Sequence, residues 1–108
     1  MDTYAIVRRN GWPTAEDLAA GAERSLAEGD RMSEDIAWIR SYVLAERDGS
    51  VGTVCIYQAS SPEAIRAHSG RADLPVDEIV KVADTLIVRL DPEPVIAQSV
   101  PQEERGSR

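Results

Sequence analysis

The chain has 108 residues, a formal net charge of −7, one cysteine and one histidine. This length fits a single domain with one modest core, and the acidic balance argues against nucleic-acid binding, which normally needs a basic surface. A single cysteine excludes an internal disulfide, no apolar run is long enough to span a bilayer, and the N-terminus lacks the features of a signal peptide, so we expect a cytoplasmic protein.

The first third of the chain predicts a strand and then an acidic helix. Residues 3–9 are rich in β-branched and aromatic side chains, and the turn-forming stretch Asn10–Pro13 ends the strand. Thr14 is a suitable N-cap for a helix that runs to about Glu28, with Gly29 as its stop. Most of the acidic excess lies on this helix and the loop after it, which is typical of a solvated face.

The middle of the chain predicts an antiparallel hairpin and a second helix. Ile36–Glu46 and Thr53–Ala59 alternate in the manner of strands, and the short turn between them favours antiparallel pairing. Ser60–Pro62 then marks a helix start, with either serine as N-cap and proline in the first turn. We expect this helix to run to about Ser69 and to stop at Gly70.

The last part of the chain predicts a fourth strand, Ile79–Leu90, and a loosely ordered tail over residues 91–108. Residues 1–90 then form one domain with the element order β-α-β-β-α-β. This order is the split βαβ arrangement, which predicts a ferredoxin-like α+β sandwich. Right-handed crossovers place the first and third strands in the centre of an antiparallel sheet with the strand order 4-1-3-2.

One face of the predicted sheet collects large side chains. Strand alternation places on it Tyr4, Ile6, Arg8, Trp38, Arg40, Tyr42, Cys55 and Tyr57. Two helices cover only one face, so we expect this second face to pair with another sheet in a homodimer of the dimeric α/β-barrel type, with a cavity between the sheets. The buried arginines need an anionic partner, from a carboxylate of the chain or from a ligand. The candidate ligand-binding residues are Trp38, Arg40, Tyr42 and Tyr57.

Several side chains are candidate metal ligands or have a structural role instead. His68, the one histidine, is either a helix-surface residue or a metal ligand or acid–base group. Cys55 is either a small buried hydrophobe or a thiolate ligand for nickel, copper or zinc. Tyr42 and Tyr57 either form an aromatic interface or offer oxygen ligands in the cavity. The predicted metal ligands are His68, Cys55 and Tyr42.

Several short motifs follow one another along the chain: Trp38–Val43, Thr53–Ala59, Pro62–His68 and Leu74–Ile79. Together they resemble a family of small bacterial proteins of unknown function that includes a nickel-responsive, nickel-binding protein. The resemblance covers residues 3–90 and implies a fold similar to that of dimeric ferredoxin-like proteins. It also implies nickel as the metal, and that the positions most typical of the family are held by Tyr42, Cys55, Tyr57 and His68.

These observations leave three functions open. The first is a small dimeric metal-binding protein with nickel at the sheet face or in the cavity between the sheets, where the identity of the metal rests on the resemblance. The second is a cofactor-independent enzyme or small-molecule binder of the dimeric α/β-barrel type, which would hold an aromatic or anionic ligand. The third is a non-catalytic interaction module. We expect a second copy of the chain as partner, and neither nucleic acid nor membrane.

Overall fold

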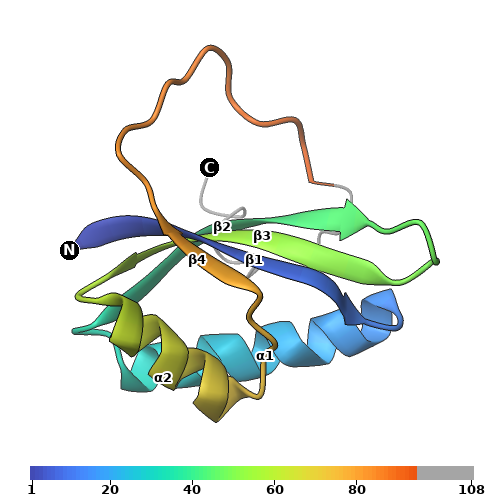
Figure 1. The fold of residues 1–108 in the computed structure, drawn as a ribbon, viewed down its shortest axis with the longest axis horizontal. Helices are drawn as coiled ribbons and strands as arrows, with labels where there is room; N and C mark the ends of the chain where they lie inside the picture. The colour runs from blue at the N-terminus through green and yellow to red at the C-terminus, as the bar shows by residue number, and fades with distance from the viewer. Residues whose placement is uncertain (95–108) are drawn as a thin grey trace.

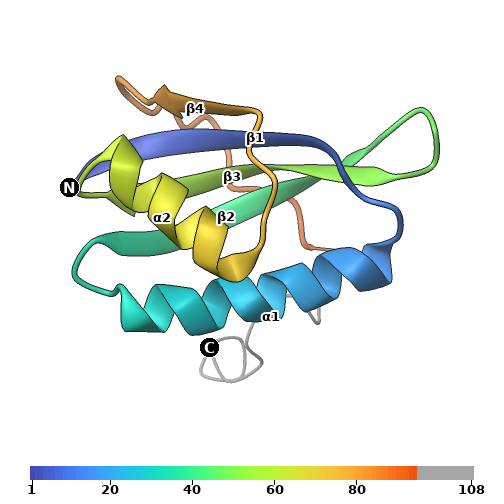
Figure 2. The same cartoon turned by 60° about the horizontal axis from the view of Figure 1, so that its bottom comes forward.

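The computed structural model describes residues 1–94. Its elements, in chain order, are β1 (Asp2–Trp12), α1 (Ala15–Arg31), β2 (Ile36–Ala45), β3 (Val51–Ala59), α2 (Pro62–Ala72) and β4 (Glu78–Lys81). The strands form one antiparallel sheet in the order β2-β3-β1-β4, and both helices lie on the same side of it (Figures 1 and 2). This is an α+β architecture of the ferredoxin-like kind, and its strand order is 4-1-3-2 when read from the β4 edge. Within the described residues no helix is long and apolar enough to cross a membrane.

Both helices begin at the N-cap residues that the sequence predicts, but neither ends at the predicted glycine. Thr14 and Ser61 are the N-caps of α1 and α2, and each side-chain oxygen accepts a hydrogen bond of 3.1 Å from the backbone N–H three residues further on. Both helices continue past the glycines expected to stop them, Gly29 and Gly70. Glycine inside a helix costs only about 1 kcal/mol, so it stops a helix weakly. Helix α2 ends instead at Asp73, whose φ of 55° is left-handed.

The prediction that the large side chains occupy the uncovered face of the sheet was wrong for six of the eight residues. The helices cover the side of the sheet that carries Tyr4, Ile6, Arg8, Trp38, Cys55 and Tyr57. The helices offer mainly small residues in return, since the buried positions of α1 are Gly21 and Ser25, and those of α2 include Ser69 and Ala72. Bulky side chains of the sheet therefore fit beneath small side chains of the helices, as close packing requires.

A β-bulge in β2 separates side chains that were predicted to share a face. The ladder between β2 and β3 skips Ile39, between Trp38 and Arg40. One extra residue inverts the alternation of every residue that follows it. Trp38 therefore faces the helices, whereas Arg40 and Tyr42 face the opposite side of the sheet.

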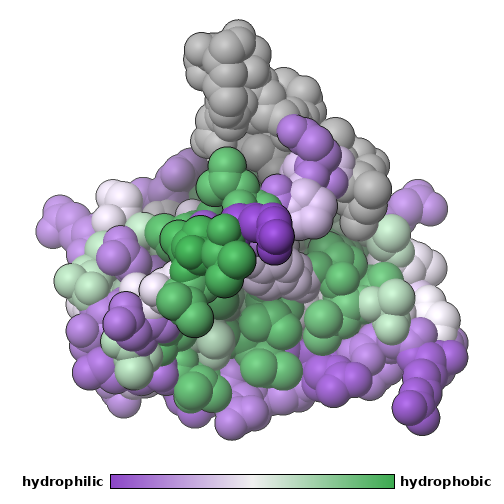
Figure 3. All heavy atoms as spheres, turned by 90° about the horizontal axis from the view of Figure 1, so that it is seen from above, coloured by the Kyte–Doolittle hydropathy of each residue, from purple (hydrophilic) through white to green (hydrophobic). Residues whose placement is uncertain are grey.

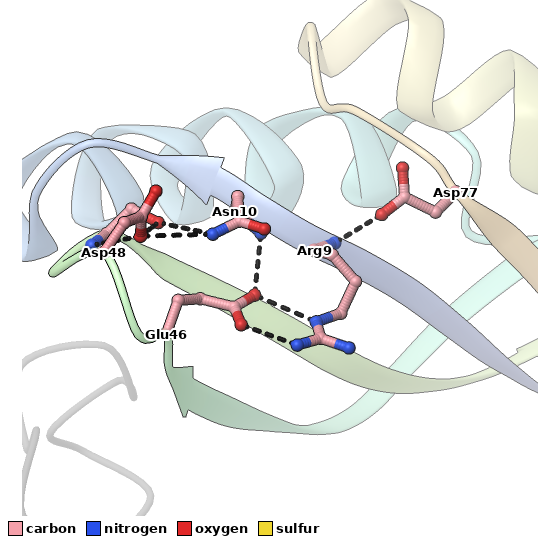
Figure 4. Close-up of polar contacts among 6 residues, drawn as sticks. Arg9, Asn10, Glu46, Asp48 and Asp77 are labelled. Carbon is pink, nitrogen blue, oxygen red and sulfur yellow. Dashed lines mark hydrogen bonds and ion pairs between the residues drawn. The ribbon is translucent and has the colours of Figure 1, made fainter.

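A second irregularity bends the end of β1, which continues through the predicted break at residues 10–12. Asn10 has a left-handed φ of 50°, and Gly52 on β3 is so close that a Cβ there would collide with the carbonyl oxygen of Arg8. Glu46 holds this bend by accepting two hydrogen bonds from the Arg9 guanidinium, at 2.8 and 3.0 Å, and one of 2.7 Å from the backbone of Asn10 (Figure 4). The Arg9 contacts hold the pKa of the Glu46 carboxyl below its usual range.

Strand β4 is much shorter than the predicted 79–90 strand. It pairs with β1 over Glu78–Lys81, and residues 83–94 form no further strand. This segment rises away from the sheet on the side opposite the helices and returns toward β2 (Figure 1). We call residues 83–94 the arch. Its apolar side chains are exposed, with Leu86 at 92% and Leu90 at 90%. Residues 95–108 of the predicted tail lie outside the described residues.

The face of the sheet opposite the helices, here called the open face, carries smaller apolar residues. The pairing of the strands places on it Ala5, Val7, Val54, Ile56 and Val80, with Arg40 and Tyr42 at the β2 edge. Neither helix of residues 1–94 covers these residues, and Figure 3, which views the molecule from this side, shows apolar side chains gathered there. The open face is therefore a half-buried apolar surface beneath the arch.

Candidate functional site

A cavity of about 550 Å³ lies between α1 and the sheet. On one side it is lined by one face of α1, from Ala15 to Leu26, where most of the residues are small. Both tryptophans of the chain line it, Trp12 from the end of β1 and Trp38 from β2. Gly21 lets Trp12 approach α1, since a Cβ at that position would stand 3.0 Å from the indole nitrogen. The small residues of α1 thus leave the space that the two aromatic rings border.

Arg8 lines this cavity and is only 1% exposed. Its Nη2 donates a 3.0 Å hydrogen bond to the Ser69 hydroxyl on α2. Its Nε and Nη1 are buried and have no hydrogen-bond partner within residues 1–94, and no carboxylate of that part of the chain forms an ion pair with it. A buried guanidinium without a counter-charge is costly, so Arg8 is the feature of the site that most requires an explanation.

A chain of hydrogen bonds runs across the wall of the cavity toward Arg8. Trp38 Nε1 donates to Ser41 Oγ at 2.8 Å, Ser41 Oγ donates to Cys55 Sγ at 2.9 Å, and Cys55 Sγ donates to Thr53 Oγ1 at 3.3 Å. Indole N–H is a donor only, so Ser41 Oγ accepts from Trp38, and Ser41 and Cys55 each donate to the next group in turn. Thr53, which lies opposite Arg8 in the ladder of β1 and β3, keeps its own hydroxyl proton free to donate.

Beside this chain lies a second polar group, formed by Tyr57, Ser25 and His68. The hydroxyls of Tyr57 and Ser25 are 2.9 Å apart, and His68 Nε2 lies 3.0 Å from the Ser25 carbonyl oxygen. Because a carbonyl only accepts, Nε2 carries the proton and Nδ1 is the unprotonated nitrogen of the neutral ring. Burial lowers the pKa of His68, and the charge of Arg8 lowers it further. Burial also raises the pKa of Tyr57 to about 12, so both rings are neutral near pH 7.

The three predicted metal ligands do not meet in one place. Cys55 and His68 are buried on the helix side of the sheet, whereas Tyr42 is on the open face, with 43% of its surface exposed. His68 Nε2 donates to the Ser25 carbonyl oxygen, while Nδ1 is buried and has no hydrogen-bond partner within residues 1–94. Cys55 Sγ belongs to the hydrogen-bond chain. Among the residues that the structure describes, no group of three or more His, Cys, Asp or Glu could hold a metal. Residues 1–94 of one chain therefore do not hold a nickel ion with these three side chains.

The four predicted ligand-binding residues do line one cavity, although it differs from the predicted cavity between two sheets. Trp38 and Tyr57 line it from the helix side, and Arg40 and Tyr42 line it where it reaches the β2 edge. There the arch completes the wall with Asp91–Pro94. Asp91 accepts a 3.0 Å hydrogen bond from Arg40 and a 3.1 Å bond from the Tyr42 hydroxyl.

Sequence reasoning missed Ser41, Thr53 and Ser25 as parts of the site. Hydroxyl residues are common on strands and helices, so their residue types carry no signal of their own. The alternation of the hairpin places Thr53 and Cys55 on one face, which is the only sequence signal of the hydrogen-bond chain. Ser41 joins them through the bulge at Ile39, and that bulge is visible only in the structure.

Comparison with known proteins places this fold in a family. The family model described as nickel responsive protein SCO4226-like matches residues 4–82, which is most of the chain. The chain belongs to the SCO4226-like family. The crystal structure of SCO4226 from Streptomyces coelicolor A3(2) has the same fold, with a TM-score of 0.61 at 23% identity over 78% of this chain and 99% of that one. No curated protein matches the chain. The family match ends at residue 82, so the arch that completes the cavity wall lies outside it.

Proposed function

We propose that this member of the SCO4226-like family is a small-molecule-binding protein whose site is the cavity between α1 and the sheet. The observation that carries the proposal is the composition of the cavity wall. Two indole rings and the small residues of α1 surround about 550 Å³ of space that also reaches a few buried polar groups. Ligand sites commonly combine this range of volume with an apolar lining and a few fixed polar groups.

The two tryptophans make this proposal testable by intrinsic fluorescence. Because both line the cavity, a small ligand that enters it changes their emission and raises the melting temperature of the protein. Suitable probes are butyrate, phenylacetate and their amides. Ala22→Phe fills the cavity from α1 and is expected to abolish the response. The matched control Ala20→Phe lies on the exposed side of α1 and is expected to leave it unchanged. Absence of any response from all four probes would overturn the proposal.

Nickel binding is the second candidate function, and the observation in its favour is membership of a family described as nickel responsive. His68, Cys55 and Tyr42 do not converge within one chain, so a nickel site that uses them needs donors from a second copy. The test is the nickel content of the protein after removal of any affinity tag and equilibrium dialysis against nickel. Retained nickel that is lost in both His68→Gln and Cys55→Ala supports the site. A chain that retains no nickel contradicts it.

We also propose that the protein is a homodimer whose copies meet at the open face. The open face presents a central band of apolar side chains that neither α1 nor α2 covers, and the arch beside it exposes Leu86 and Leu90 almost completely. Exposed apolar patches of this kind mark association surfaces. Analytical ultracentrifugation is expected to give twice the chain mass of 11.8 kDa. Val80→Glu on the open face is expected to give the single-chain mass, whereas the control Ala67→Glu on the exposed side of α2 is expected to keep the dimer. A wild-type mass of one chain would overturn the proposal.

A further inference from the structure

We infer that the ligand of the cavity is a small organic acid whose carboxylate is bound by Arg8 and Thr53. This inference rests on the proposed function, because it names the chemical class of the ligand that the cavity takes. The description of the family as nickel responsive does not point to an organic acid. It follows from the unpaired cation at the base of the cavity, from the direction of the hydrogen-bond chain beside it, and from the apolar character of the remaining wall.

The first step is the charge of Arg8. A guanidinium stays protonated at any physiological pH, so its burial cannot be relieved by losing the proton. Ser69 satisfies one of its nitrogens, and Nε and Nη1 remain without a partner in residues 1–94. The neighbouring rings do not compensate the charge, because Tyr57 and His68 are both neutral near pH 7. Two carboxylates of residues 1–94, Asp91 and Glu93, also line the cavity, but neither forms an ion pair with Arg8, and a ligand in the cavity can supply the negative charge instead.

The second step is the free proton of Thr53. Trp38, Ser41 and Cys55 each donate to the next group, and Thr53 accepts at the end of this chain. Its hydroxyl therefore has a proton to give, and it lies directly opposite Arg8 on the neighbouring strand. A donor oriented in this way favours an acceptor, and a carboxylate oxygen is the strongest acceptor that also neutralises the arginine.

The third step is the body of the ligand. Beyond Arg8 and Thr53 the wall includes Trp12, Trp38 and the apolar face of α1, together with polar groups at the β2 edge and in the arch. Its apolar part favours an aliphatic or aromatic body over a compact inorganic anion. The far end of the cavity carries Asp91, whose charge is paired with Arg40. The anionic end of a ligand therefore binds at Arg8 and Thr53, and its apolar body lies against the indole rings and the apolar face of α1.

The test compares acids with amides of the same shape: butyrate with butyramide, and phenylacetate with phenylacetamide. Affinities are measured through tryptophan fluorescence. We expect the better acid to bind about tenfold more tightly than its amide, or more, since charge-assisted hydrogen bonds are the strong ones. Arg8→Met is expected to remove that preference, so that the acid and its amide bind with similar affinity. Thr53→Val, which keeps the shape of the side chain, is expected to lower the affinity for the acid several-fold. Arg66→Met, on the exposed side of α2, removes the same charge from the protein and is expected to change nothing.

The outcomes separate this inference from the proposed function. Amides that bind as tightly as the acids, or an acid affinity that Arg8→Met does not change, would overturn the inference and leave the ligand-binding cavity in place. Failure of all four probes would overturn the proposed function and the inference with it. Inorganic phosphate that competes as well as the better acid would show that the site takes a compact anion, and would also overturn the inference. If Arg8→Met does not fold, Arg8→Lys keeps the charge without the planar donors, and we expect it to bind the acid more weakly than wild type does.

Discussion

The two faces of the same sheet are built on different principles. The helix side buries the large polar and aromatic side chains, including Arg8, Tyr57 and the hydrogen-bond chain that ends at Thr53. The open face carries smaller aliphatic residues that are only half-buried, and its polar contacts are exposed. Chemistry is thus concentrated beneath the helices, and the surface that suits association lies opposite. Burial separates these two roles, because a polar group needs a specific partner only where water cannot reach it.

A matched pair of substitutions measures this difference most directly. Ile6 is fully buried on the helix side, whereas Ile56 is half-buried on the open face. We expect Ile6→Ala to lower the free energy of unfolding by about 3 kcal/mol and Ile56→Ala by about 1 kcal/mol, because only the first leaves a closed cavity. Urea unfolding measures both values. Equal losses in the two variants would contradict a half-buried open face. A loss in Ile56→Ala that grows with protein concentration would support a homodimer that buries the open face.

The adjacent arginines of β1 provide the second contrast. Arg8 is buried and forms no ion pair with a carboxylate of residues 1–94, whereas Arg9 is exposed and is held by Glu46 through two hydrogen bonds. We expect Arg8→Met to raise the free energy of unfolding by about 1–2 kcal/mol, because an uncompensated buried charge is replaced by an apolar chain of similar length. Arg9→Met is expected to lower it slightly, with an effect that fades at high salt. Urea unfolding at low and high salt checks both. A large destabilisation by Arg8→Met would show that the charge is already compensated in the free protein.

The sequence predicts the elements of this molecule better than its faces. Helix starts at Thr14 and Ser61 and the hairpin could be predicted, because capping and turn chemistry is local. The face of the sheet that the helices cover could not be predicted. It depends on how the bulky side chains of the sheet fit against the small residues of α1, such as Gly21 and Ser25. The bulge at Ile39 adds a second error, since nothing in the residue types around it marks the change of phase.

For the site, residue chemistry was a better guide than position. Trp38 and Tyr57 were predicted as ligand-binding residues on an open face, and both line a cavity on the covered one. Arg8 was recognised as a residue that needs an anion, and its burial without a counter-charge keeps that requirement. Thr53 could not be found in the same way, because its free proton depends on the directions of three hydrogen bonds between residues of two strands.

The free energy of unfolding is expected to depend on pH through His68, which is buried on the helix side of the sheet. Burial lowers the pKa of folded His68 below the ordinary 6.5, so the unfolded chain binds the proton more readily. The stability that depends on neutral His68 is fully present above pH 6.5 and is lost as the pH falls through that value toward the folded pKa. The slope cannot exceed about 1.4 kcal/mol per pH unit for one proton. Urea unfolding at about pH 7.5 and about pH 5.5 measures it, and His68→Gln is expected to abolish the difference. An unchanged slope in that variant would assign the effect to another group.

The smallest expected effect concerns the contact that fastens the arch to the open face. Asp91 pairs with Arg40 at 3.0 Å, and about half of each side chain is exposed, 46% for Asp91 and 49% for Arg40. Exposed pairs of this kind contribute roughly 0.5 kcal/mol, so Asp91→Asn is expected to lower the free energy of unfolding by no more than that. A double-mutant cycle with Arg40→Met isolates the pair from the other contacts of each residue. A coupling energy well above 1 kcal/mol would mean that this contact is shielded from water in solution. Because the arch lies on the open face, the shield would be a second copy of the chain, and the coupling would then weaken in Val80→Glu.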